Sequence, residues 1–337
     1  MRNTLPAKEA LPLEPQTSSW RIRPGHTLRF IPIILCALFY ILSTLGSTIP
    51  LYRNLKYALP SSAWVSRAIS RLGSHFPLPV DLHLDQDHYI SQQTTNFFVF
   101  ILLIACMFAA YGLCMYVVYR GYTQRRNVYI LLFIVAVTAI AGYIYVFTPG
   151  TLSEDVYEYA NYGRTLFFHH ANPYFAPPSA FQQDPSFQFV HWKDTVPIYG
   201  PIWTLVSALL AAVAGTSQFS YFLNFRTFAY LVHLLNTGLV IAILRARGES
   251  PRRVALGTLF YAWNPLVLFE SCLGGHNDIF MVTFLLLGLL FSTHAERRGT
   301  KPFPSYIFSC IAFTLATLVK LTIAPKLFRF DLRKISG

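Results

Sequence analysis

Residues 128–147 read VYILLFIVAVTAIAGYIYVF, and residues 153–164, a few positions later, read SEDVYEYANYGR. The first stretch is apolar and long enough to cross a bilayer as a helix, which takes about 20 residues. The second is acidic and rich in Tyr, and it lies in a long polar connection, 149–200. Long connections of this kind usually carry function. The sequence therefore predicts a membrane protein whose site lies beside this connection.

The composition also favours a membrane protein over a soluble one. Of 337 residues, 54% are hydrophobic and 12% charged, and the mean hydropathy is +0.42, whereas soluble domains carry about 25% charged residues. The net charge of +12 does not indicate nucleic acid, because Lys and Arg occur in short clusters between apolar runs, as in cytoplasmic loops. We interpret the cysteines as small apolar residues without a redox or metal role: Cys36, Cys106, Cys114, Cys272 and Cys310.

The apolar runs predict an all-α fold, a polytopic transmembrane helical bundle of about eight membrane segments. These segments are 30–48, 97–119, 128–147, 202–214, 221–244, 254–272, 279–292 and 304–323. The run that begins at 202 is short for a span, and we expect it to be re-entrant or partly embedded. The basic clusters at 120–126, 245–253 and 297–301 then all face the cytoplasm, together with the basic leader.

This topology divides the chain into regions. We expect residues 1–28, rich in Pro, Ser and charge, to form a disordered cytoplasmic tail. Residues 29–325 form the transmembrane domain, with outer loops at 49–96 and 149–200, the second carrying short helices. The protein is then a multi-pass protein of the cell membrane, with a cytoplasmic N-terminus and an extracytoplasmic site.

The acidic start of the second outer loop has the form of a helix N-terminus. Thr151 and Glu154 make a capping box, which leaves Asp155 free in the first turn. Asp155, Glu158 or Tyr159, and Tyr162 recur at helical spacing, so one face presents a carboxylate beside aromatic rings. Such a face suits carbohydrate. The alternative is an amphipathic helix on the membrane surface with Tyr at the headgroups.

Two further motifs follow in the same loop. The sequence HHANPY, residues 169–174, contains His170, which can contact a phosphate or simply lie at the membrane interface. The sequence YGP, residues 199–201, leads back toward the membrane. Gly200 there permits close backbone approach beside Tyr199, although turn formation alone would also explain it.

A polar break, GGHND at 274–278, separates two apolar runs. Paired glycines with His276, Asn277 and Asp278 are hard to explain by packing, because Gly weakens helices and charge is costly near lipid. Lys320 is a lone cation in an apolar helix and suits a phosphate. All of these, with Arg226 and Glu270, lie on the same membrane face as Asp155 in the expected topology, which predicts one site. Interfacial charges that extend to water are the alternative for each.

Metal binding is open at two places. The patch DLHLDQDH, residues 81–88, has metal-ligating residue types, although solvated loop charge explains it as well. At the main site, one or two carboxylates serve as a base with or without a divalent cation such as Mg²⁺ or Mn²⁺. The sequence requires no cofactor, and it has no Gly-rich phosphate loop.

Together, SEDVYEYANYGR, NPY, YGP, GHND and the intramembrane Lys resemble the GT-C superfamily of integral-membrane glycosyltransferases. The order of motifs is most similar to bacterial polyprenol-phosphomannose-dependent α-1,6-mannosyltransferases and covers about 128–325. The resemblance implies a cell-envelope hexosyltransferase. Such an enzyme moves a sugar, here mannose, from a polyprenyl-phosphate-linked donor to a glycan or glycolipid acceptor on the outer membrane face.

The resemblance also implies roles for residues. A carboxylate in the outer loop acts on the acceptor hydroxyl, and Asp155 matches that position, with Glu154 as second choice. Cationic groups stabilise the leaving phosphate, for which Arg164, His276 and Lys320 are our candidates. The expected substrate-binding residues are Tyr159, Arg164, His170, Tyr199, His276, Asn277, Asp278 and Lys320.

Other interpretations stay open. Members of the resembled group continue with further helices, whereas here a basic tail, 326–337, follows. A truncated or frameshifted reading frame would explain this tail, and the chain would then be an inactive fragment. A secondary transporter or lipid flippase is a different class, marked by broken helices at mid-membrane and by internal repeats. We see no clear repeat.

Overall fold

The computed structural model describes residues 31–53, 86–121, 127–148, 153, 155–216, 218–298 and 303–320. Within these ranges the chain is helical and has no strand, as predicted. Its elements are, in order, α1 (Ile31–Arg53), α3 (Gln86–Gly121), α4 (Asn127–Val146), α5 (Asp155–Phe167), η3 (Pro178–Phe181), η4 (Phe187–Phe189), α6 (Pro201–Ala214), α7 (Gln218–Ala246), α8 (Pro251–Ala262), α9 (Pro265–Leu268), η5 (Phe269–Leu273), α10 (Asp278–Arg298) and α11 (Phe303–Val319).

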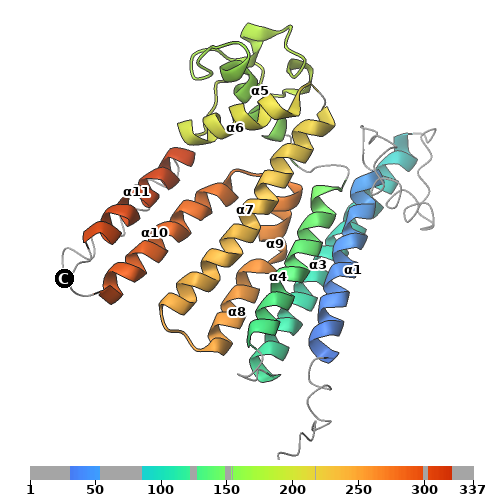
Figure 1. Ribbon diagram of the computed structural model, residues 1–337. Coiled ribbons are helices and arrows are strands. Elements are labelled where there is room, and N and C mark those ends of the chain that lie inside the picture. The colour runs from blue at the N-terminus through green and yellow to red at the C-terminus, as the bar shows by residue number, and fades with distance from the viewer. Residues whose placement is uncertain are drawn as a thin grey trace, which may run out of the picture.

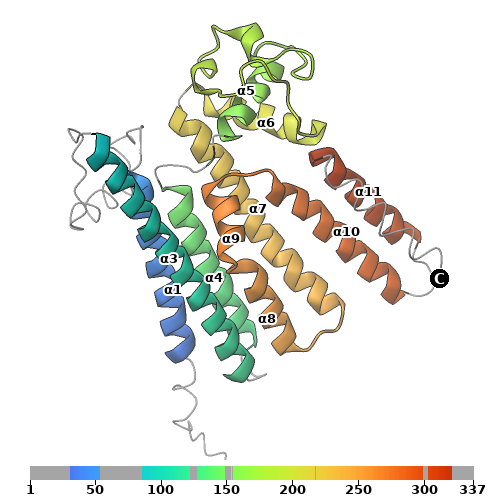
Figure 2. The ribbon, with the colours of Figure 1, turned by 180° about the vertical axis from the view of Figure 1, so that it is seen from behind.

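The long helices form one bundle (Figures 1 and 2). Five of the described helices are long and apolar enough to cross a membrane: α1, α3, α4, α7 and α10. Their outer faces are apolar, and Leu102, Leu132 and Leu235 are each more than half exposed. Helices that are apolar on their outer faces as well as inside require lipid around them. The predicted transmembrane helical bundle is therefore confirmed.

α6 lies across one end of the bundle, the end at which α4 finishes and α7 begins (Figures 1 and 2). Its 14 residues make a helix of about 21 Å, shorter than the hydrocarbon core of about 30 Å. Trp203 and Ser207 are buried on its inner side. Leu205, Leu209 and Val213 face outward with exposed fractions of 58, 65 and 78%. This arrangement agrees with the prediction that the run beginning at 202 does not cross the membrane.

The predicted continuous segment 254–272 is interrupted, which corrects the sequence interpretation. α8 ends at Ala262, and Asn264 begins a new helix by accepting a hydrogen bond from the backbone N–H of Leu266 at 3.1 Å. Pro265 is the first residue of that helix, where its missing N–H costs nothing. α9 then continues into η5, a π-helical turn. The break directs η5 toward the polar end of the bundle (Figure 2).

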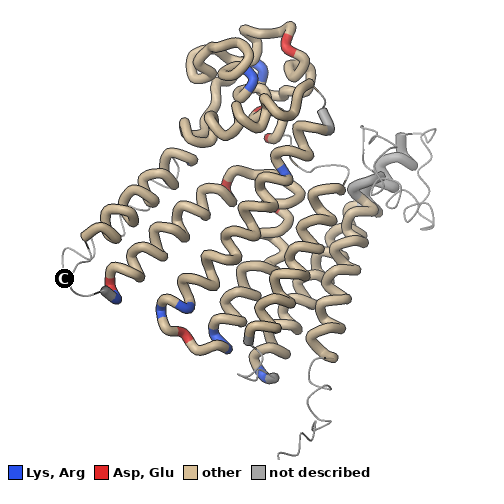
Figure 3. Tube along the Cα trace, viewed as in Figure 1, with Lys and Arg blue, Asp and Glu red and all other residues tan. Residues whose placement is uncertain are grey.

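Charge is concentrated at the two ends of the bundle (Figure 3). The basic residues at the end of α7, the start of α8 and the end of α10 lie opposite α5. Asp155 begins α5 and Asp278 begins α10, at the other end. The basic clusters in these elements therefore share one end of the molecule, as the sequence predicted.

Several predictions concern residues outside the described ranges. They are the cytoplasmic tail 1–28, the capping box of Thr151 and Glu154, the side chains of the patch 81–88, and the tail 326–337. These predictions stay predictions.

Candidate active site at the polar end of the bundle

Asp155 stands at the first turn of α5, and its surroundings hold this helix firmly. The helix is buried along most of its length, from Val156 to Thr165. Gly163 contacts the backbone of Ser207 in α6 so closely that a Cβ would overlap it. The carboxylate of Asp155 remains accessible, with 38% of its side chain exposed, and it accepts a hydrogen bond from the hydroxyl of Tyr159 at 3.5 Å. A rigid helix thus presents an accessible carboxylate.

The turn after η5 brings His276 to this carboxylate. The Nδ1 atom of His276 lies 3.4 Å from Oδ2 of Asp155, and its Nε2 atom lies 3.4 Å from Oε2 of Glu270. Gly275 has a φ of 66°, which suits glycine. At Gly274 a Cβ would overlap the ring of His276. The two glycines therefore let the imidazole fold back between the carboxylates.

The third contact joins α10 to α11. Nζ of Lys320 donates to both carboxylate oxygens of Asp278, at 2.8 and 2.9 Å. Asp278 is the first residue of α10, where a negative charge suits the helix dipole. Lys320 follows directly after α11. The lone lysine and the HND turn are thus brought together, as predicted.

The YGP motif completes the polar end. The backbone N–H of Gly200 donates to the carbonyl of Val319 at 3.0 Å, and a Cβ on Gly200 would overlap the carbonyl oxygen of Leu318. Gly200 is therefore needed for close backbone approach. Tyr199 packs its ring edge-on against Tyr159, with centroids 4.9 Å apart, so both predicted tyrosines adjoin Asp155.

Asn277 is buried, with 1% of its surface exposed. Neither polar atom of its side-chain amide has a hydrogen-bond partner within the described part of the chain. A buried unpaired polar group costs about 1–3 kcal/mol, and such groups in native proteins usually have a functional reason.

The charges of the site influence one another. The contact with His276 and the hydroxyl groups nearby outweigh burial and lower the pKa of Asp155. Burial would lower the pKa of His276, but the carboxylates of Asp155, Glu270 and Asp278 outweigh it and raise that pKa. At neutral pH, Asp155 is therefore ionised, and the protonated form of His276 is favoured more than in water.

A family model described as alpha-(1->6)-mannopyranosyltransferase, N-terminal domain, matches residues 79–329. The chain belongs to this mannosyltransferase family. The predicted resemblance to α-1,6-mannosyltransferases is thereby confirmed, and the chain carries a mannosyltransferase domain in an all-helical membrane fold. Comparisons with curated proteins and with solved structures gave no match.

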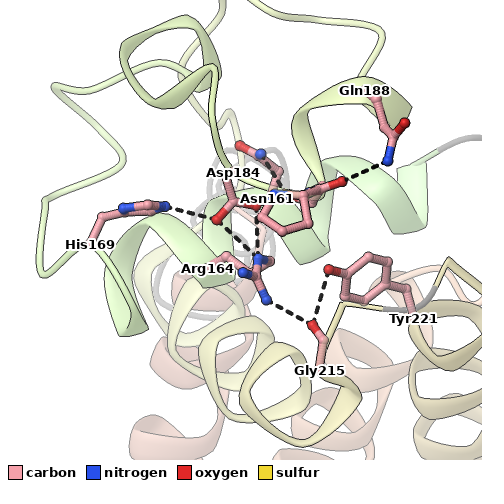
Figure 4. A network of polar contacts seen from close by, with 9 residues as sticks. Asn161, Arg164, His169, Asp184, Gln188, Gly215 and Tyr221 are labelled. Carbon is pink, nitrogen blue, oxygen red and sulfur yellow. Dashed lines mark hydrogen bonds and ion pairs between the residues drawn. The ribbon is translucent and has the colours of Figure 1, made fainter.

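In this mannosyltransferase-family chain, Arg164 lies apart from Asp155 in a buried network of its own (Figure 4). Its Nε donates to both oxygens of Asp184, at 2.8 and 3.1 Å, and its Nη1 donates to the carbonyl of Gly215 at 2.7 Å. Only 7% of its side chain is exposed. Because Nε and Nη1 donate inside the protein and the side chain is buried, we do not retain Arg164 as a phosphate ligand. His169 joins the network at 2.8 Å from Asp184.

His170 also lies away from the contacts around Asp155. It is exposed and lies in the turn that follows α5, where its φ is 50°. This left-handed backbone is uncommon for a residue other than glycine. We assign His170 a turn position, and its contact with a phosphate stays a prediction.

Sequence reasoning placed Glu270 on the membrane face of Asp155 without a role and offered Glu158 as the alternative to Tyr159 on the helix face, and it did not single out Asp184. Glu158 is buried and accepts hydrogen bonds from the backbone N–H groups of His191 and Trp192, at 2.8 and 2.9 Å. Burial raises its pKa despite these bonds. Its position one turn after Asp155 was a signal that it faces the same region. Asp184 stands in an irregular segment, where no periodic pattern indicates its partner.

The described residues contain no cluster of side chains arranged to bind a metal ion. No three side chains of His, Cys, Asp or Glu converge there as metal ligands do. A divalent cation at this site therefore stays a prediction.

Proposed function

We propose that this chain transfers a mannosyl group from a polyprenyl-phosphate-linked donor to a hydroxyl of a glycan or glycolipid acceptor. The observation that carries the proposal is the convergence of Asp155, His276 and the Asp278–Lys320 pair at one end of the bundle, in a chain of a mannosyltransferase family. Ionisable residues gathered at a membrane boundary usually line a functional site.

Asp155 is the general base in this proposal. As the acceptor oxygen attacks the anomeric carbon, its proton passes to Asp155, the new C–O bond forms, and the bond from the anomeric carbon to the donor phosphate breaks. The pKa of Asp155 is lowered, so the carboxylate is ionised at neutral pH, as a general base must be before it takes the proton. Glu154 is the neighbouring alternative and lies outside the described residues.

Lys320 and His276 are the cations for the departing phosphate. An ammonium has three N–H donors, and Lys320 uses two on Asp278. The third remains for a phosphate oxygen, while Asp278 holds the lysine in place. His276 adds a second positive charge beside Asp155.

The remaining residues suit a sugar and a lipid. Tyr199 is partly exposed, so its ring can pack against the C–H face of a sugar. Tyr159, which was predicted to do the same, is buried behind Tyr199 and supports that ring instead. The buried amide of Asn277 has no hydrogen-bond partner in the described part of the chain and offers both donors and an acceptor. An apolar groove of about 460 Å³ runs along α11, whose last residue precedes Lys320, and suits a prenyl chain. Its lining residues are Phe303, Tyr306, Ile307, Cys310, Ile311, Thr314 and Leu315.

The charge distribution supports an extracytoplasmic site in the cell membrane. The basic clusters of α7, α8 and α10 lie at the end opposite Asp155 (Figure 3). Clusters of Lys and Arg are retained on the cytoplasmic side during insertion. The site then opens on the outer side, where a lipid-linked donor replaces a soluble nucleotide sugar.

Asp155→Asn tests this function. The change keeps the shape of the side chain and removes its basicity, so we expect transfer to fall by about 100-fold or more. Labelled mannose transferred from a polyprenyl-phosphate donor in membranes that contain the chain is the readout. Asp194→Asn, which alters an exposed loop carboxylate, is the matched control. Full activity in Asp155→Asn, at an equal amount of inserted protein, would falsify the assignment.

A further inference from the structure

We propose that Glu270 is a positioning residue, which holds His276 as an imidazolium with Nδ1 turned toward Asp155. The inference rests on the proposed function, in which Asp155 acts as the base. Glu270 does not itself reach the acceptor in this role; it acts through the imidazole ring. Its carboxylate lies 3.4 Å from Nε2, and 51% of its side chain is exposed.

The geometry of the ring selects its charged form. Both nitrogens of His276 face a carboxylate oxygen at 3.4 Å, Nδ1 toward Asp155 and Nε2 toward Glu270. A neutral imidazole has a single N–H and leaves a lone pair on the other nitrogen. In His276 that lone pair would face a negatively charged carboxylate oxygen of Asp155 or Glu270. Only the imidazolium presents an N–H to both carboxylates.

The backbone fixes Glu270 for this contact. η5 is a π-helical turn, closed by the hydrogen bond from the N–H of Gly274 to the carbonyl of Phe269 at 2.9 Å. The N–H of His276 then donates to the carbonyl of Glu270 at 3.2 Å. Both side chains therefore project from one tight turn. Single π-helical turns occur frequently at functional sites.

Charges from every neighbouring element act on the imidazole. The positive charge of Arg226 in α7, whose stem lies near Gly275, opposes protonation, and the charge of Asp278 is largely matched by Lys320. Among the described residues, the unmatched carboxylates nearest the ring are those of Asp155 and Glu270. The titratable and charged groups that face the turn from the described elements are Asp155 and Tyr159 from α5, Glu270 from η5, Arg226 from α7, Asp278 from α10, Lys320 after α11, and Tyr199.

Nuclear magnetic resonance of the whole chain in lipid nanodiscs, with ¹³C-labelled histidine, tests the contact without any sugar transfer. The signal of His276 is identified by its loss in His276→Gln. Glu270→Gln removes the negative charge and lowers the pKa of His276 by about half a pH unit, as expected for a half-exposed ion pair. Glu270→Asp keeps the charge and retains most of the wild-type value. Glu249→Gln changes a partly buried carboxylate in the connection between α7 and α8, which is paired with Arg253 rather than with the imidazole, and leaves the pKa of His276 unchanged.

The pH dependence of transfer provides the second readout. Because activity requires the imidazolium, the alkaline limb of kcat follows the pKa of His276. Glu270→Gln moves this limb to lower pH by the same amount and leaves KM for the acceptor unchanged, and Glu270→Asp restores it. A merely structural role for Glu270 would lower activity equally at all pH values.

The outcomes separate this inference from the proposed function. An unchanged pKa of His276 in Glu270→Gln overturns the inference, whether or not the chain transfers mannose. An unshifted alkaline limb in an active Glu270→Gln variant also overturns it. Full transfer by Asp155→Asn, in contrast, overturns the function while the coupling between Glu270 and His276 remains measurable.

Discussion

At the scale of single residues, Asp184 connects several parts of the polar segment between α5 and α6, residues 168–200. It accepts hydrogen bonds from Arg164, from the backbone N–H and hydroxyl of Ser186, and contacts His169. Burial would raise its pKa, but these donors outweigh it and hold the pKa well below the usual range. One carboxylate thus ties the irregular segment to α5, the helix that begins with Asp155.

Asp184→Asn is expected to destabilise this segment by about 3 kcal/mol, because it leaves a buried guanidinium without its counter-charge. Proteolytic cleavage between 170 and 200 in membranes, and thermal unfolding, measure the effect. The contribution of Asp184 is complete at neutral pH, because its folded pKa is lowered, and it declines only as the pH falls below about 5. Equal protease resistance in Asp184→Asn and Asp194→Asn would contradict this role.

The same residues show what could be predicted from sequence. Asp155, Asp278 and Lys320 were found because each is an ionisable residue at the end of an apolar run, where charge is costly. Arg164 looked equally suitable for a phosphate. Its partner Asp184 lies 20 residues away in a segment without periodicity, so no local pattern showed that its charge was already matched.

At the scale of elements, the end of α11 is held by one backbone contact. Gly200 donates to Val319 and leaves no space for a Cβ beside Leu318. This contact fixes the position from which Lys320 reaches Asp278. Gly200 itself has a φ of −74°, which any residue adopts, so the requirement for glycine is steric alone.

Gly200→Ala is therefore expected to displace the end of α11, at a cost of about 1–3 kcal/mol, and to lower mannosyl transfer. Thermal stability and transfer measure the two effects. A matched control is Gly112→Ala, because Gly112 has open space around it. If Gly200→Ala behaves like Gly112→Ala in both measurements, the contact does not hold the lysine.

The helices were predicted best where a long apolar run was the only strong signal in the sequence. The long apolar helices follow directly from composition, and their bounds agree within a few residues for α4 and α7. The break at Asn264 and Pro265 was missed because continuous apolarity outweighed a local helix-start signal. The π-helical turn that carries Glu270 leaves no distinct trace in sequence, since its geometry depends on packing.

At the scale of the whole molecule, the two ends of the bundle differ in chemistry. One end carries the basic clusters of α7, α8 and α10 (Figure 3). The other end carries Asp155, Asp278 and His276 together with the segment built on α5. Between the two ends the described helices carry almost no charge. Because basic clusters are retained on the cytoplasmic side, this division supports the orientation proposed above.

Chemical labelling tests this direction. Gln182→Cys places a thiol in the segment above α5, and Glu249→Cys places one at the basic end. A membrane-impermeant maleimide added to intact cells should label the first variant only, and both after permeabilisation. The parent chain controls for its own cysteines. Labelling of Glu249→Cys in intact cells would reverse the proposed orientation.

The outward row of Leu205, Leu209 and Val213 on α6 has a consequence for access by the donor. The opposite face of α6 contacts α5 through Gly163. In the orientation proposed above, this apolar row would rest in the outer layer of the bilayer, and the depth of α6 would then fix the distance of Asp155 from the hydrocarbon. For the proposed lipid-linked donor, that distance would select the depth at which its phosphate meets the carboxylate.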